Sequence, residues 1–148
     1  MSHQIVLATK EHVPATYKLL KEFAVERGVG HSFKLTEDRL YHLFETHGLG
    51  ALLAYSNETI IGIITFYETI STFSGDAGLH IEDMYIHPDY QRKGIGKALL
   101  DGMIDETKSR GYAKLEWQCA VDNPGAMEFY KKMGAVKDDM WKTFTYYI

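Results

Sequence analysis

A short basic segment, Gln91-Arg92-Lys93-Gly94-Ile95-Gly96-Lys97, stands where an apolar strand pattern gives way to a helical one. Free N–H groups converge at a helix N-terminus, where the helix dipole is positive, and such a site binds anions. Gly94 and Gly96 let the backbone approach a phosphate, and the basic side chains add charge to hold it. The segment favours a diphosphate-binding turn. On spacing alone, a plain strand-to-helix turn with a solvated basic edge is an equally good interpretation.

Two common phosphate motifs are excluded. No Gly-Lys-Ser/Thr follows, so the turn is not a Walker loop, and position 99 is Leu where a dinucleotide fingerprint needs its third glycine. The only cysteine is Cys119, which excludes a disulfide within the chain and a thiolate-rich metal site and is interpreted as a small apolar residue of a buried strand. The seven histidines show no tight metal-ligand spacing, so we expect no metal.

Two carboxylates lie in the strand pattern just before the basic turn. Glu82 and Asp83 are candidates for attracting or deprotonating a cationic group. In a regular strand they point to opposite faces of the sheet, unless a bulge turns the strand there. Tyr130 is a third candidate, although its helical spacing from Ala126 and Met133 is also typical of a core aromatic.

The elements that must position these residues follow from periodicity and punctuation. The pattern predicts an α/β fold with a sheet of mixed strand directions, because a hairpin precedes two strand-helix units. Thr9, Thr36 and Asn123 are expected helix caps, and Ser56-Asn57-Glu58 the hairpin turn. The expected strands are 4–8, 50–55, 59–67, 79–86, 113–121 and 141–148, and the expected helices start after Thr9, Thr36, Gly94 and Asn123.

Composition limits the range of functions. The 148 residues are 45% hydrophobic, enough for a single domain spanning 1–148. With 20 acidic against 16 basic side chains and a net charge of −4, the chain lacks the positive field that nucleic acids or anionic membranes attract, so neither is an expected partner. No apolar run approaches the roughly 18 residues of a membrane span, and the first residues do not resemble a leader, so we expect a cytoplasmic protein.

The sequence resembles the GNAT superfamily of N-acetyltransferases over nearly its whole length. The motifs that carry the resemblance are Leu79-His80-Ile81-Glu82-Asp83-Met84-Tyr85-Ile86-His87-Pro88, the Gln-x-x-Gly-x-Gly turn at Gln91, and Asn123-Pro124-Gly125-Ala126-Met127-Glu128-Phe129-Tyr130. Within the superfamily it is most similar to the diamine (spermidine/spermine) branch. The resemblance implies a mostly antiparallel central sheet flanked by helices, with acetyl-CoA in a cleft after the fourth strand.

The resemblance also implies a role for each motif. Gln91, Arg92, Lys93, Gly94, Ile95, Gly96 and Lys97 would bind the cofactor diphosphate. The backbone of Met84, Tyr85 and Ile86 would pair with the pantetheine arm, which Asn123 and Ala126 would flank. Tyr130 would be the proton donor, and Glu82 would contact or help to deprotonate the amine, beside Asp83.

The sequence departs from the diamine branch at two places. The branch carries a Tyr-Glu pair at the end of its first helix, where this chain has Glu26 and Arg27, and the cation at Arg27 would repel a polyamine. The residue before the Asn-Pro helix is Asp122 and not the frequent tryptophan, which adds acid on the substrate side. A small amine, a polyamine, a thialysine-like amino acid and a peptide amine all stay open as acceptors.

The leading hypothesis is an acetyl-CoA-dependent N-acetyltransferase that acts on a primary amine. A non-catalytic acyl-CoA sensor is the first alternative, and the presence of both Glu82 and Tyr130 argues against it. An unrelated nucleotide-binding α/β fold is the second. Relatives of this kind are commonly homodimers, and the apolar segment 143–148 would mediate such contact if it is not a simple edge strand.

Overall fold

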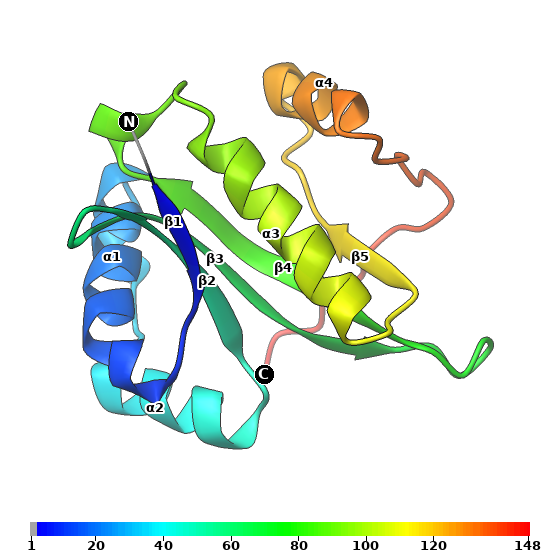
Figure 1. The fold of residues 1–148 in the computed structure, drawn as a ribbon. Coiled ribbons are helices and arrows are strands. Elements are labelled where there is room, and N and C mark those ends of the chain that lie inside the picture. Colours follow the sequence, from blue (N-terminus) through cyan, green and yellow to red (C-terminus); the bar gives the residue numbers. More distant parts are fainter. Residues whose placement is uncertain (1–2) are drawn as a thin grey trace. The chain divides into compact units, whose positions relative to one another are not determined.

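The computed structural model describes residues 3–148, which form two compact units, one ending at Trp117 and the other running from Gln118 to Ile148 (Figure 1). The first unit contains β1 (Gln4–Leu7), α1 (Val13–Glu26), α2 (Glu37–Thr46), β2 (Gly50–Ser56), β3 (Thr59–Ile70), β4 (Ala77–Ile86), α3 (Ile95–Ser109) and β5 (Lys114–Trp117). The second contains α4 (Pro124–Lys132).

The strands form one five-stranded sheet in the order β1-β2-β3-β4-β5. The first four are antiparallel to their neighbours, and β5 runs parallel to β4. The predicted hairpin is present, and Asn57 at its turn has a positive φ of 54°, a conformation that asparagine tolerates better than most residues. The prediction of mixed, mostly antiparallel strands is confirmed.

Helices cover both faces of the sheet (Figure 1). On one face, α1 and α2 pack through Val13, Leu20 and Leu40 against the buried strand residues Leu53 and Ile63. On the other face lies α3, whose Leu99 and Met103 are fully buried. A Cβ added at Gly102 would come within 3.2 Å of Ile5 and Leu52, so the small residue lets α3 lie close to the sheet.

Several element boundaries differ from the prediction. Thr9 precedes a short 3-10 turn, Lys10–His12, and α1 begins only at Val13, with Pro14 in its first turn as helix geometry favours. Strand β3 runs on to Ile70 and β4 starts at Ala77. Strand β5 ends at Trp117, since it has β4 as a partner over four residues only. Cys119 therefore lies outside any strand and is half-buried, which corrects its assignment to a buried strand.

The predicted final strand is wrong. Residues 141–148 have no regular secondary structure, and the sheet of the described chain has no sixth strand. Trp141 is 78% exposed, and the large apolar side chains Phe144, Tyr146, Tyr147 and Ile148 are exposed too. The sequence of residues 141–148 favours a strand, but no strand of the described chain pairs with this segment.

Candidate active site

The basic turn leads into α3 through two residues with positive φ. Arg92 has φ 61°, and Gly94, the N-cap, has φ 82°. No side chain caps the helix and its first turn carries no acid, so its first N–H groups face outward unpaired by side chains of the described chain. The turn therefore presents free amides at a helix start, the feature that an anion site requires.

Gly96 allows the start of α3 to lie directly on β4. A Cβ at this position would meet the Cδ1 atom of Ile86 and the Cε atom of Met84, both at 3.1 Å. The first helical amides are therefore held next to the strand whose residues 84–86 were expected to bind the pantetheine arm. The glycine is required by this close approach rather than by its φ.

The polar side chains of the turn have different partners. Gln91 donates through Nε2 to the carbonyl of Ile86 at 3.0 Å, which ties the turn to the end of β4. Lys97 forms an ion pair with Asp101 at 2.7 Å, so part of its charge is already balanced. The Nζ atom of Lys93 lies 5.5 Å from the ring centre of Tyr90. Arg92 and Lys93 are thus the better sources of charge for a phosphate.

Beyond Ile81, one edge of β4 is open in the sense that no strand among residues 3–148 pairs with it. Strand β5 pairs with β4 only from Gly78 to Ile81, while β3 pairs with it as far as Ile86. The amide of His87 donates to Ile61 of β3 at 2.8 Å, and backbone groups alternate sides along a strand. It follows that the backbone groups of Met84 and Ile86 point to the open edge and those of Tyr85 point to β3.

A β-bulge at Glu82 interrupts β4. Thr65 of β3 is paired with Asp83 and Phe66 with Ile81, so Glu82 is the extra residue. Because of the bulge, Glu82 and Asp83 do not follow the regular strand pattern in which adjacent side chains point to opposite faces of the sheet. Asp83 accepts a hydrogen bond from the buried Thr65 hydroxyl at 2.8 Å, and its own amide donates back to that oxygen at 3.1 Å. Asp83 therefore has a structural partner, whereas the Glu82 side chain is 57% exposed.

His80 lies beside Glu82, and two further residues, Glu116 and Tyr67, lie next to the histidine. His80 lies with Nε2 4.0 Å from Glu82, and its other ring nitrogen is 3.8 Å from Glu116 of β5. The ring of Tyr67 packs on His80 with centroids 4.9 Å apart. Burial, and then the charges of Glu82 and Glu116, raise the pKa of Tyr67 above its ordinary value. Only knowledge of the strand register would have revealed this cluster.

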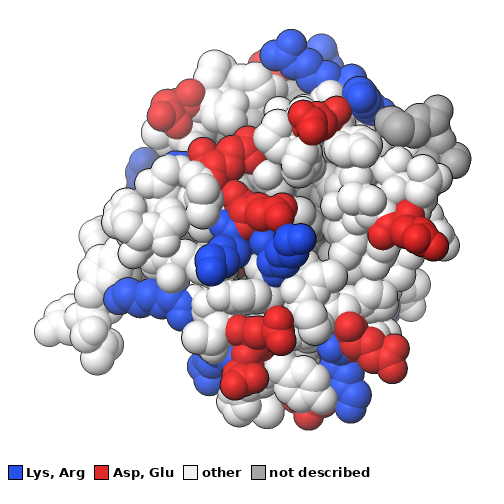
Figure 2. All heavy atoms as spheres, turned by 90° about the vertical axis from the view of Figure 1, so that its left-hand side faces the viewer, with Lys and Arg blue, Asp and Glu red and all other residues white. Residues whose placement is uncertain are grey.

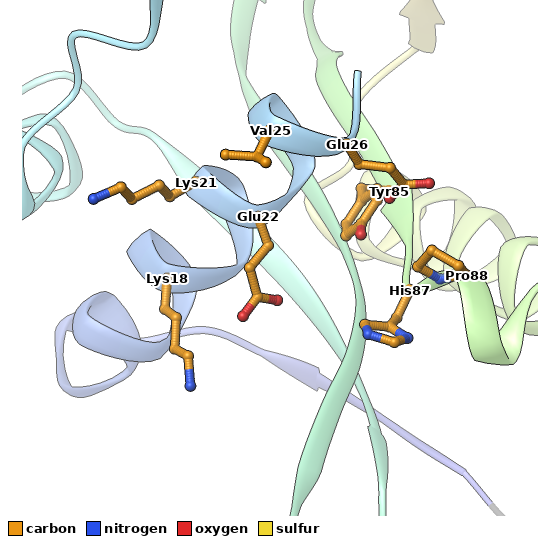
Figure 3. Close-up of a pocket in the computed structure, with 8 residues that line it drawn as sticks. All are labelled: Lys18, Lys21, Glu22, Val25, Glu26, Tyr85, His87 and Pro88. Carbon is orange, nitrogen blue, oxygen red and sulfur yellow. The ribbon is translucent and has the colours of Figure 1, made fainter. Parts of the chain in front are cut away.

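Glu26 lines an open pocket of about 470 Å³ between α1 and the end of β4 (Figure 3). Its other lining residues are Lys18, Lys21, Glu22, Val25, Tyr85, His87 and Pro88. Burial, followed by a hydrogen bond with Glu26, raises the pKa of Tyr85, whose phenol stays neutral at ordinary pH. Arg27 is not a lining residue, because its guanidinium lies 5.5 Å from the centre of the Phe23 ring, which itself stacks on Tyr85.

The second unit holds the remaining predicted residues. Asn123 caps α4 by accepting a hydrogen bond from the amide of Ala126 at 3.1 Å, so its side chain serves the helix start. Tyr130 lies on α4 and is half-buried. Burial, and secondly the charge of Cys119, raise the pKa of its hydroxyl above the ordinary value. The phenol is therefore protonated at neutral pH, as a proton donor must be.

Charges of both signs are interspersed on the face of the molecule that Figure 2 shows, and no broad basic patch covers that face. Within residues 3–148, no three His, Cys, Asp or Glu side chains are grouped so that they could hold a metal ion. No helix among these residues is long and apolar enough to cross a membrane.

Comparison with known proteins identifies the class. Residues 13–135 match the model of the Acetyltransferase (GNAT) family, and the chain belongs to this family. It is therefore an N-acetyltransferase of a family that uses acetyl-CoA as the acetyl donor. This confirms both the resemblance noted from the motifs and the expected fold.

Individual relatives agree with the family assignment. The chain is 28% identical to thialysine N-epsilon-acetyltransferase of Caenorhabditis elegans over 144 residues, which covers 95% of this chain and 89% of that protein. It is 25% identical to the enzyme of the same name from Bos taurus, with 80% and 75% covered. An aminoglycoside acetyltransferase from an uncultured soil metagenomic sample, solved with sisomicin, has the same fold, with a TM-score of 0.88 at 18% identity over 99% of this chain and 96% of that one.

The close packing of Gly96 leads to a prediction about CoA binding. Gly96→Val is expected to weaken CoA binding by at least about tenfold, or roughly 1.4 kcal/mol, because the new side chain would push the start of α3 away from Met84 and Ile86. Calorimetric titration with CoA measures the effect. Asp105→Val, at an exposed site of the same helix, is the matched control and should leave the affinity unchanged. Equal affinities in the two variants would contradict the placement of the diphosphate.

Proposed function

We propose that this acetyltransferase transfers the acetyl group of acetyl-CoA to the primary amine of a small molecule, with an amino acid that resembles thialysine or a polyamine as the favoured acceptor. The observation that carries the proposal is the start of α3, where Gly96 lies against the side chains of Met84 and Ile86 at the end of β4. Glu82 lies in the same strand, at a bulge four residues before Ile86. A donor with a diphosphate and an extended amide-containing arm fits these features together.

Different residues would bind the diphosphate and the pantetheine arm of the donor. The amides of Ile95, Gly96 and Lys97, with the side chains of Arg92 and Lys93, would hold the diphosphate. The outward N–H and C=O of Met84 and the N–H of Ile86 would pair with the pantetheine arm as an added strand, while the carbonyl of Ile86 already accepts from Gln91. The outward N–H of Met84 is the candidate for stabilising the oxyanion that forms as the amine attacks the thioester.

Glu82 supplies the amine side of the reaction. A primary amine with a pKa near 10.4 is almost entirely protonated at neutral pH, and only its neutral form attacks a thioester. An exposed carboxylate attracts and orients the cation, and it receives the proton directly or through a water molecule. Asp83, held by Thr65, adds negative charge beside it.

Tyr130 supplies the proton that the leaving group needs. Collapse of the tetrahedral intermediate expels the CoA thiolate, and a phenol is close in pKa to a thiol, so proton transfer between them is nearly balanced. The raised pKa keeps the hydroxyl of the half-buried Tyr130 neutral, which supports this role. The family model extends over both units, 13–135, which supports one catalytic domain over 1–148 that includes Asn123 and Ala126 beside the donor.

The named relatives and the pocket favour an amino acid over a long polyamine. Two relatives are named for thialysine, which carries a carboxylate beside its amines. The pocket offers both acids, Glu22 and Glu26, and bases, Lys18 and Lys21. Arg27 is drawn onto Phe23, which lessens its expected repulsion of a cationic substrate. A peptide amine is the second candidate acceptor, and an acyl-CoA sensor is the alternative without chemistry.

Release of the CoA thiol from acetyl-CoA tests the proposal across thialysine, ornithine, lysine, spermidine, an aminoglycoside and a short peptide. We expect the highest kcat/KM with thialysine or another small diamino acid. Preference for the peptide would support the second candidate. If no amine causes release of CoA although CoA binds tightly, the protein is an acyl-CoA sensor and not an enzyme.

A homodimer in the cytoplasm is the proposed assembly. Its support is the exposed apolar segment 141–148, in which Phe144, Tyr146 and Tyr147 have no strand partner in the described chain. The full chain is expected to sediment as a dimer and a chain ending at Asp139 as a monomer. Equal masses per particle for both would contradict a role of the segment in dimerisation.

A further inference from the structure

His80 lies between two carboxylates. One ring nitrogen is 4.0 Å from Glu82 and the other is 3.8 Å from Glu116. The histidine side chain is only 15% exposed, while those of Glu82 and Glu116 are 57% and 44% exposed. The partly buried imidazole therefore lies between an exposed acid of its own strand, Glu82, and a second exposed acid on another strand, Glu116.

Three strands fix the imidazole in this position. In the sheet register, Tyr67 of β3 is directly opposite His80 on one side, and Glu116 of β5 is opposite it on the other. The Tyr67 ring packs on the imidazole at 32° between planes. Lys114 holds Glu116 with an ion pair of 3.4 Å. The charged and titratable groups that face His80 are thus Tyr67, Glu82 and Glu116, with Lys114 behind the last.

The two distances are too long for direct hydrogen bonds, so a proton passes between the ring and either carboxylate after a small movement of the exposed carboxylate or through a water molecule that contacts both groups. An imidazole donates at one nitrogen while it accepts at the other, so it can receive a proton on one side and release one on the other. Neither carboxylate can do this alone, because an ionised carboxylate only accepts. The arrangement has the parts of a proton path from Glu82 to the surface.

We propose that His80 relays the proton of the amine substrate from Glu82 to Glu116 and solvent. The inference rests on the proposed function and adds a residue to it. One N–H bond of the ammonium breaks and its proton passes through Glu82 and water to the nearer imidazole nitrogen. The proton on the other nitrogen leaves towards Glu116, and the freed lone pair of the amine attacks the thioester. His80 is a positioning and relay residue, since it acts through Glu82.

Proton affinity favours this path. A carboxylate with a reference pKa near 4.3 holds a proton from an amine weakly, whereas an imidazole, near 6.5, is better matched to neutral pH. The relay removes the proton from Glu82 after each transfer, so the carboxylate is again ionised and attracts the next substrate. Loss of His80 should therefore affect kcat more than the KM for the amine.

The test is the pH profile of His80→Gln. In the wild type, kcat/KM should fall at low pH through an ionisation that depends on His80. In the variant this ionisation should be lost, and kcat at neutral pH should fall by roughly tenfold to a hundredfold. His42→Gln, an exposed histidine of α2, is the matched control and should retain the wild-type profile.

Chemical rescue separates a relay from a structural role. In His80→Ala, added imidazole should restore part of kcat in proportion to its neutral form, which a residue needed only for folding would not show. Wild-type turnover with an unchanged profile in His80→Gln and no rescue of His80→Ala would overturn the relay alone. Absence of turnover in the wild type with every amine would instead overturn the proposed function, and the relay with it.

Discussion

Tyr130→Phe is expected to lower kcat by about a hundredfold or more, the usual contribution of a general acid, with little change in the affinity for acetyl-CoA. The substitution removes one oxygen from a half-buried ring and leaves its packing. The thiolate must then leave without a proton from the protein. Steady-state kinetics with the best acceptor, together with calorimetry for acetyl-CoA, separates the two effects.

The raised pKa of Tyr130 determines on which side of the pH profile activity is lost. Burial raises the pKa of the Tyr130 hydroxyl, so the donor form is present at all lower pH values and is lost only as the pH rises through that raised value. On the alkaline side of the profile, the wild type should therefore lose activity only at strongly alkaline pH, and the variant should lack this alkaline limb. Tyr41→Phe, on α2, is the matched control with unchanged kcat expected. Full activity of Tyr130→Phe would exclude the tyrosine as donor.

Glu82→Gln is expected to lower kcat/KM by about a hundredfold, because it removes both the charge that attracts the amine and the first acceptor of its proton. The side chain is 57% exposed, so the fold should tolerate the amide. The loss should lessen as the pH approaches the pKa of the amine, since neutral substrate then needs no base. Initial rates over a pH series with one acceptor measure this convergence.

Two controls support the interpretation of Glu82→Gln. Glu58→Gln, in the β2–β3 turn, removes the same charge at a distant exposed site and should leave kcat/KM unchanged. Asp83→Asn weakens the acceptor of the Thr65 hydroxyl and should lower the thermal stability more than Glu82→Gln does. A loss for Glu82→Gln that is constant over the whole pH series would exclude a role in deprotonation.

Local signals in the sequence predicted much of the scaffold. Thr36 and Asn123 cap their helices with side-chain hydrogen bonds, and Gly94 has the left-handed conformation at the start of α3. The hairpin turn at Asn57 follows the same logic. Each of these depends on residues within a few positions of one another, which is the range over which propensity and capping operate.

Features that depend on distant pairing were not predictable. The bulge at Glu82 is defined by the register of β4 against β3, and the position of His80 beside Glu116 by the register of β4 against β5. The same limit explains the final segment. Its alternating apolar pattern favours a strand, yet residues 141–148 have no partner in the sheet, and a strand needs one.

Mass spectrometry of the products from acetyl-CoA and thialysine tests the central claim most directly. We expect one acetyl group on the side-chain amine, formed with stoichiometric release of CoA, and strongly reduced product with both Tyr130→Phe and Glu82→Gln. Stoichiometric hydrolysis of acetyl-CoA without acetylated amine, or equal product from the wild type and both variants, would contradict it.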